Sequence, residues 1–130
     1  TAKDLMTPRV AAPTLPGKAS LESVKSTLLE NNSTWWVVLG EEVDKVVGVA
    51  NREKLLTSLL QGDSDLTPYD LSERVEFVPE MIRVDRLLLG FNDDKNGVRV
   101  VVDEFGGFVG LIGAEAVLAV LAGWWRKSNT

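Results

Sequence analysis

Cationic residues gather at the start of one predicted helix in the middle of the chain. Asn51, Arg52 and Lys54 directly follow an apolar run that ends at Ala50. The unpaired backbone N–H groups of a helix N-terminus attract anions, so Arg52 and Lys54 beside them could bind a phosphate. The alternative is that both cations are solvated helix-surface residues and that Asn51 is only the N-cap. The residues alone leave both interpretations open.

A glycine-rich stretch nearer the C-terminus is the second candidate for ligand binding. From Val101 to Leu121 the residues predict a strand, a turn at Gly106-Gly107, a second strand, and a helix that opens after Gly113. A turn, a sheet edge and a helix start together resemble a nucleotide cradle. Ala116, however, stands in the first helical turn, where an acid that binds ribose would be expected.

Acidic residues offer a third, weaker kind of site. Asp103-Glu104 and Asp93-Asp94 are hard oxygen ligands that suit Mg²⁺, but acids in turns and helix-end loops are more often solvated, and we predict no metal site. The chain has no His and no Cys, which excludes catalytic triads and thiolate chemistry. Its net charge of −5 argues against nucleic acid. We therefore expect neither an enzyme nor a nucleic-acid partner.

The elements that must position these residues belong to an internal repeat of about half the chain. "LPGKASLESVKSTLL" from Leu15 aligns with "VPEMIRVDRLLLGFN" from Val78, and "VGVANREKLL" from Val47 aligns with "VGLIGAEAVL" from Val109. "DLMTP" from Asp4 also matches "DLSER" from Asp70. A period this long that occurs only twice favours a pseudo-symmetric pair over a solenoid.

Each half predicts the order strand-helix-strand-strand-helix. Apolar residues recur at helical spacing after Pro16 and after Pro79. β-Branched and aromatic runs predict the strands, which are Trp35–Leu39 and Val46–Ala50 in the first half and Val98–Val102 and Phe108–Ile112 in the second. The 130 residues suffice for one compact domain or two small halves that share a core. We expect an α/β (α+β) fold of two β-α-β-β-α units, residues 1–62 and 63–130, packed through their sheets.

Three motifs in this order resemble a tandem pair of CBS motifs. They are "DLMTPR" at Asp4, "FVPE" at Phe77 and "VVVDEFGGFVGL" from Val100. More narrowly, the chain is similar to the CorC/hemolysin-C-like family of magnesium and cobalt efflux proteins over nearly its whole length. The resemblance implies a homodimer of CBS pairs with AMP or ATP in clefts between the motifs. It also implies a cytosolic module that follows a membrane domain absent from this chain, at the cytoplasmic face of the plasma (inner) membrane. The start at Thr1 without Met fits an excised piece.

The resemblance also assigns site residues. In the family, a Thr or Ser and, three residues later, an Asp follow the last strand, and the Asp accepts both ribose hydroxyls. Gly113 and Ala116 stand at these positions in the second motif, and Asn51 and Lys54 in the first. Losing a charged hydrogen bond typically costs ~1.5–3 kcal/mol, so AMP or ATP should bind weakly if at all.

The predicted site is completed by four further residues, which are Arg9, Arg52, Phe77 and Arg99. The family position of Arg9 would bring it near Asn51, Arg52 and Lys54, which favours weak, phosphate-led binding at the first cleft. Phe77 and Arg99 belong to the second cleft, where Arg99 replaces a small residue of the family and could fill the adenine space.

Paired tryptophans leave two functions open. One of Trp35-Trp36 should face the core and one should face outward, and Trp124-Trp125 follow a helix that is apolar almost all round, near Val117 to Leu121. Such aromatic surface usually marks an interface, either between copies or with a membrane or membrane domain. The resemblance implies a regulatory module of a membrane ion-transport protein that senses an adenosine nucleotide or another anion. The alternative is a degenerate pair that serves only dimerisation.

Overall fold

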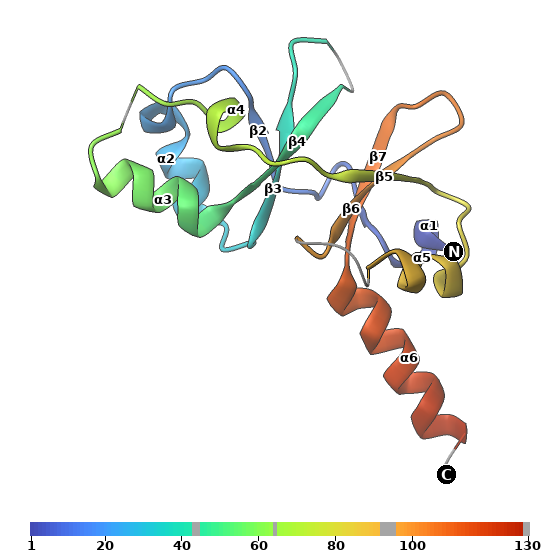
Figure 1. Ribbon diagram of the computed structural model, residues 1–130. Coiled ribbons are helices and arrows are strands. Elements are labelled where there is room, and N and C mark those ends of the chain that lie inside the picture. The colour runs from blue at the N-terminus through green and yellow to red at the C-terminus, as the bar shows by residue number, and fades with distance from the viewer. Residues whose placement is uncertain (43–44, 64, 92–95, 129–130) are drawn as a thin grey trace. The chain divides into compact units, whose positions relative to one another are not determined.

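The chain folds into two compact units, each with its own small sheet. The structure, a computed structural model, describes residues 1–42, 45–63, 65–91 and 96–128. Unit 1 contains residues Thr1–Val10 and Glu76–Thr130, and unit 2 contains Ala11–Val75. Figure 1 shows the elements of both units. Among the described residues no helix is both long and apolar enough to cross a membrane.

Unit 2 is built on a three-stranded sheet in the order β2-β3-β4. Strands β2 and β3 are parallel and are joined through a helix, whereas β3 and β4 form an antiparallel hairpin. Its elements are β2 (Thr14–Pro16), α2 (Leu21–Glu30), β3 (Trp35–Leu39), β4 (Val46–Asn51), α3 (Arg52–Leu60) and α4 (Pro68–Leu71).

Unit 1 repeats this arrangement and adds one edge strand. Its sheet has the order β1-β7-β6-β5, in which β5 and β6 are parallel while β6-β7 and β1-β7 are antiparallel. Its elements are α1 (Ala2–Leu5), β1 (Thr7–Pro8), β5 (Glu76–Pro79), α5 (Val84–Phe91), β6 (Val98–Val102), β7 (Phe108–Gly113) and α6 (Ala114–Ser128).

Apolar residues at helical and strand spacing form a separate core in each unit. In unit 2 the side chains of Leu21 and Leu28 on α2 are fully buried beside Trp36 of β3. In unit 1 Leu87 of α5 and Val117 of α6 are buried against the sheet. The predicted helix faces therefore pack as expected. Trp36 is a core residue, whereas Trp35 is half-buried.

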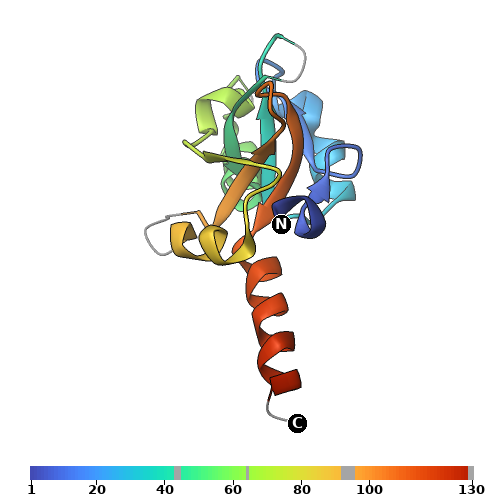
Figure 2. The same cartoon turned by 90° about the vertical axis from the view of Figure 1, so that its right-hand side faces the viewer.

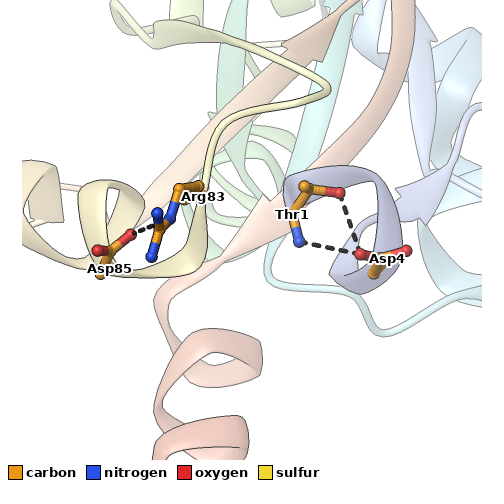
Figure 3. A network of polar contacts seen from close by, with 4 residues as sticks. All are labelled: Thr1, Asp4, Arg83 and Asp85. Atoms are coloured by element: carbon orange, nitrogen blue, oxygen red, sulfur yellow. Dashed lines mark hydrogen bonds and ion pairs between the residues drawn. The ribbon is translucent and has the colours of Figure 1, made fainter.

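The repeat extends to two short helices with the same N-terminal contacts. The carboxylate of Asp4 accepts hydrogen bonds from the amine and hydroxyl of Thr1 at 2.9 and 3.0 Å (Figure 3). Asp70 accepts from the backbone N–H and hydroxyl of Thr67 at the same distances. The match between "DLMTP" and "DLSER" thus marks two equivalent helices, α1 and α4.

Each short helix packs on the hairpin of the other repeat. Residues 1–10 precede the first repeat but belong to unit 1, where Thr7 pairs with Leu111 of β7. Residues 67–75 precede β5 but belong to unit 2, where Glu73 pairs with Val49 of β4. The compact units therefore differ in composition from a simple halving of the chain, and the division of the repeat at residues 62 and 63 stays a prediction about the motifs.

Candidate functional site

Unit 1 contains a cleft of about 290 Å³ between the start of β5 and the inner side of α5. Its walls combine an aromatic ring, apolar side chains, two arginines and one acid: Glu76, Phe77 and Val78 of β5, Ile82, Arg86, Leu87 and Gly90 on and before α5, and Arg99 of β6. The cleft is close to the lower end of the usual range for small-molecule sites.

Two of the predicted residues meet in this cleft. The ring of Phe77 is 50% exposed and so is open to a ligand. Arg99 lies opposite Glu76 in the β5–β6 register and is only 4% exposed. The structure therefore places Phe77 and Arg99 on the wall of the same cleft.

The guanidinium of Arg99 is held by the end of α5. Its Nη1 donates to the carbonyl of Val98 at 2.9 Å, and its Nη2 donates to the carbonyl of Gly90 at 2.5 Å. The guanidinium carbon lies 4.5 Å from the centroid of the Phe91 ring, within cation–π range. These contacts hold the Arg99 side chain against the end of α5, where it forms part of the cleft wall.

Gly113 and Ala116 lie at the start of α6 and do not line this cleft. The backbone N–H of Ala114 donates to Gly97 at 2.8 Å, which fixes where the helix begins. A Cβ placed on Gly113 would meet nothing nearer than the Gly97 carbonyl at 3.8 Å, so a side chain has room there. Ala116 packs half-buried against the core of unit 1. Neither position supplies a hydroxyl or a carboxylate.

In unit 2 the predicted residues divide between two roles. Asn51 caps α3, with its side-chain oxygen accepting from the backbone N–H of Lys54 at 3.3 Å. Arg52 points to the end of α2, where its Nε donates to the carbonyls of Leu28 and Asn31 at 2.9 and 3.1 Å. Backbone carbonyls at a helix C-terminus attract cations, so this arginine has a structural use.

Unit 2 has a cleft of its own, and two of the predicted residues line it. It measures about 440 Å³ and is lined by Asn51, Glu53, Lys54, Thr57, Ser58 and Leu71. The Lys54 ammonium lies 3.8 Å from the Glu73 carboxylate and is mostly exposed. The last predicted cation, Arg9, belongs to unit 1, where its guanidinium lies 5.9 Å from the centroid of the Phe108 ring. The structure thus unites Asn51 and Lys54 in one cleft.

The acidic turn that suggested a magnesium ligand has a local explanation. One carboxylate oxygen of Asp103 accepts from the backbone N–H groups of Phe105 and Gly107, both at 2.9 Å, and Gly106 has a φ of +82°. Asp103 therefore shapes the β6–β7 turn. Asp93 and Asp94 lie outside the described residues. Within the described part of the chain, no three metal-ligating side chains gather into one group.

The sequence analysis missed several residues of the unit 1 cleft. Glu76, Ile82, Arg86 and Gly90 line it. Arg86 and Gly90 are four residues apart and so share one face of α5. That spacing is visible in the sequence, but it does not show that this face of the helix meets β5.

Comparison with known sequences finds relatives over nearly the whole chain. The chain is 38% identical over 122 residues to a UPF0053 protein of Synechocystis sp. and 32% identical over 124 residues to the magnesium and cobalt efflux protein CorC of Vibrio cholerae. These matches cover 94% and 93% of the chain but only 35% and 42% of the two relatives. The chain therefore spans less than half the length of either. No family model matches it.

Solved structures match over a similar share. The CBS domain of a bacterial CNNM/CorC family Mg²⁺ transporter in complex with ATP matches with a TM-score of 0.84 at 33% identity, over 93% of this chain and 86% of that one. A CBS domain protein of Shewanella oneidensis matches with a TM-score of 0.83 at 27% identity, over 93% and 96%. A CBS-domain pair with bound AMP from Klebsiella pneumoniae, at 22% identity and a TM-score of 0.78, shows a likeness of fold alone.

Proposed function

Because the chain belongs to the CBS-domain pairs of the CNNM/CorC family of Mg²⁺ transporters, we propose that it is the regulatory module of an ion-transport protein. In this proposal it senses a phosphate-bearing ligand, with AMP and ATP as the first candidates, and acts on a membrane domain at the cytoplasmic face of the inner membrane. The observation that carries the proposal is the cleft of unit 1, where the Phe77 ring and the Arg86 side chain line the same space.

The residues of this cleft fit part of a nucleotide. An exposed aromatic ring such as Phe77 can stack on a nucleobase, and an arginine fork such as Arg86 suits phosphate oxygens. The cleft lining holds no ribose clamp, and Gly113 and Ala116, which stand at the hydroxyl and acid positions of the family, lie outside this cleft at the start of α6. We therefore expect weak binding that depends on the phosphate and falls with added salt, because exposed charge contacts are screened over ~8–10 Å.

The amino-acid composition and the relatives of the chain favour a sensor over an enzyme. The chain has no His or Cys, and its relatives are transporter proteins and CBS domains. We propose no reaction for either cleft. Binding would act by changing the stability of one conformation relative to another, which needs only a difference in affinity between the two.

Calorimetric titration with AMP and with ATP tests the proposal. Arg86→Ala and Phe77→Ala should each weaken binding, whereas Arg83→Ala should not, because Arg83 lies one turn earlier and does not line the cleft. Arg83 instead pairs with Asp85 at 3.4 Å, also drawn in Figure 3. Equal affinity in all four proteins, or tight binding of uncharged adenosine that ignores salt, would contradict a phosphate-led site.

A pair of CBS motifs that only dimerises is the second candidate. The observation in its favour is the apolar surface of α6, on which Leu118, Trp124 and Trp125 are exposed. The absence of any AMP or ATP binding, together with a stable dimer, would favour this function over the sensor.

A further inference from the structure

The N-terminal segment, residues 1–10, is held on unit 1 by contacts near both of its ends. The backbone N–H groups of Ala2 and Lys3 donate to the carbonyls of Ile82 and Glu80, both at 2.9 Å. At the other end, the N–H of Arg9 donates to Val109 of β7 at 2.9 Å. Pro8, which has no N–H to donate, lies opposite Gly110 in this edge strand. The segment thus bridges the β5–α5 turn and the edge of the sheet.

The segment and the cleft share the same wall. Ala2 is 0% exposed and belongs to the core cluster that also contains Val78 and Leu87. Val78, Leu87 and Ile82 are in turn three of the residues that line the cleft. Val78, Leu87 and Ile82 therefore belong to the core against which the segment packs, and they also line the cleft.

Close contact with Gly110 seats the segment. A Cβ on Gly110 would lie 2.8 Å from the carbonyl oxygen of Thr7 and would also collide with the side chain of Met6. Only glycine permits this approach. Strand β1 itself is two residues long, so few ladder bonds join it to β7.

We propose that docking of the N-terminal segment and occupancy of the unit 1 cleft are coupled, so that a ligand in the cleft tightens the segment. The segment would then pass the state of the cleft to any polypeptide joined before it. Coupling of this kind is reciprocal, because a docked segment must strengthen ligand binding by the same factor. The ligand half of the inference rests on the proposed function, whereas the link between segment and cleft wall does not.

Hydrogen exchange without ligand tests that link directly. Gly110→Ala should release the segment and raise exchange at residues 1–10 and also at residues 76–90. We expect at least about a fivefold rise at the cleft wall, the lower end of usual coupling factors. Gly48→Ala is the matched control, because a Cβ there would lie 2.6 Å from the carbonyl oxygen of Glu73 at the equivalent contact of unit 2. It should leave residues 76–90 unchanged.

A milder variant covers the case in which Gly110→Ala unfolds the unit. Ala2→Pro removes the N–H that bonds to Ile82 and adds ring carbons at a buried position, and it copies Pro68, which is buried at the equivalent first position of α4. It should raise exchange at residues 76–90 by a smaller factor. If the segment is released in either variant while exchange at residues 76–90 stays at the wild-type rate, the inference is wrong.

Titration with ATP separates this inference from the proposed function. In wild type, ATP should slow exchange at residues 1–10, and Gly110→Ala should weaken ATP binding by about fivefold or more. If wild type binds no ATP, the proposed function fails, and the ligand-free exchange alone decides whether segment and cleft wall are linked. If ATP binds equally well to wild type and Gly110→Ala, the coupling is refuted while the sensor remains.

Discussion

At the level of single residues, the start of α6 lacks the two side chains that would bind the ribose of a nucleotide. The backbone N–H groups of a first helical turn are present, but Gly113 and Ala116 add no polar group to them. A side chain at Gly113 has room, and an acid in the first turn suits the helix dipole, which favours supplying the missing groups. The half-buried packing of Ala116 against the core of unit 1 opposes the larger acidic side chain.

We therefore expect the double variant Gly113→Thr, Ala116→Asp to bind AMP more tightly than wild type. One restored charged hydrogen bond contributes ~1.5–3 kcal/mol, or roughly tenfold to more than a hundredfold in affinity. Calorimetry with AMP measures it. Ala119→Asp, one helical turn later, adds the same charge away from the helix start and should leave affinity unchanged.

Arg99 decides how the double variant behaves. Its guanidinium contacts Gly90 and Phe91 and lines the cleft, so Arg99→Ala in both backgrounds should enlarge the cleft. If the folded double variant binds AMP no better even with Arg99→Ala, the cleft has been remodelled beyond its clamp. The dimerisation function would then replace the sensor.

The pair formed by Lys18 and Glu41 is the clearest titratable contact in unit 2. The ammonium lies 2.7 Å from the carboxylate, and this hydrogen bond raises the pKa of Lys18 and lowers the pKa of Glu41. A lowered carboxyl pKa stabilises the fold above the unfolded pKa of Glu, about 4.3, and the contribution disappears as pH falls through the lowered value. The raised pKa of Lys18 means that its contribution to stability is present below the unfolded pKa of Lys and disappears as pH rises through the raised value. Both groups are exposed, so the effect on stability is small.

Titration of the Glu41 carboxyl by NMR should show this shift. We expect its midpoint below the ordinary range in wild type and a return to that range in Lys18→Gln, because the hydrogen bond is the main cause. Added salt should have a similar but smaller effect. Lys25→Gln on the exposed side of α2 is the control. If that control moves the midpoint as much as Lys18→Gln does, net charge and not the contact sets the pKa.

At the level of elements, Arg52 and Lys54 show how one predicted cation pair divides between structure and ligand binding. Arg52 connects the start of α3 to the last carbonyls of α2, whereas Lys54 lines a cleft. We expect Arg52→Ala to lower the free energy of unfolding by about 1.5–3 kcal/mol, the usual value for hydrogen bonds from a charged group. Lys54→Ala should change stability by less than about 0.5 kcal/mol.

Urea unfolding and phosphate titration together check this division. Phosphate binding by unit 2, where it occurs, should weaken in Lys54→Ala and persist in folded Arg52→Ala. If Arg52→Ala is as stable as wild type but no longer binds phosphate, the result would favour the sequence-based hypothesis that Arg52 and Lys54 bind phosphate together.

Element boundaries were the most predictable part of the fold. The strands Trp35–Leu39 and Val98–Val102 were predicted with the observed bounds, and the strands that follow each extend one residue further than predicted. Their β-branched and aromatic residues favour strands regardless of distant contacts. The likeness to solved CBS domains confirms the predicted α/β class and the CBS-pair resemblance.

Long-range contacts explain what the sequence did not predict. The partners of Arg52 lie 24 and 21 residues back along the chain, and no local pattern encodes that approach. Gly90 and Arg86 became cleft residues only through the packing of α5 beside β5. Phe77 and Arg99 were predicted because the family resemblance, and not their spacing, drew attention to them.

At the level of the whole molecule, the two repeats exchange their leading segments. Residues 1–10 complete unit 1, and residues 67–75 complete unit 2, so neither repeat forms its full sheet edge from its own half. Gly48 and Gly110 occupy equivalent positions where these segments approach. Truncation within either segment therefore affects the unit formed by the other repeat.

Helix α6 carries the apolar surface that we expect to join two copies of the chain. Its first turns pack on unit 1 and its last turns extend beyond the sheet (Figure 2). Val117, which the sequence analysis included in this surface, is 0% exposed and belongs to the core of unit 1. The exposed apolar side chains of α6 are instead those of Leu118, Trp124 and Trp125, which are 56%, 53% and 68% exposed. Aromatic side chains of this kind are enriched in interfaces, so we expect a homodimer in solution.

Sedimentation equilibrium at micromolar concentrations measures this association. Leu118→Glu with Trp125→Glu places charge on one side of α6 and should weaken the dimer at least about 30-fold, the equivalent of losing one 2 kcal/mol hot spot. Phe105→Ser is the matched control, because Phe105 is 88% exposed but lies in the β6–β7 turn. A monomeric wild type would contradict the dimer outright. If Phe105→Ser weakens the dimer as much, the interface is not confined to α6 and includes the β6–β7 hairpin.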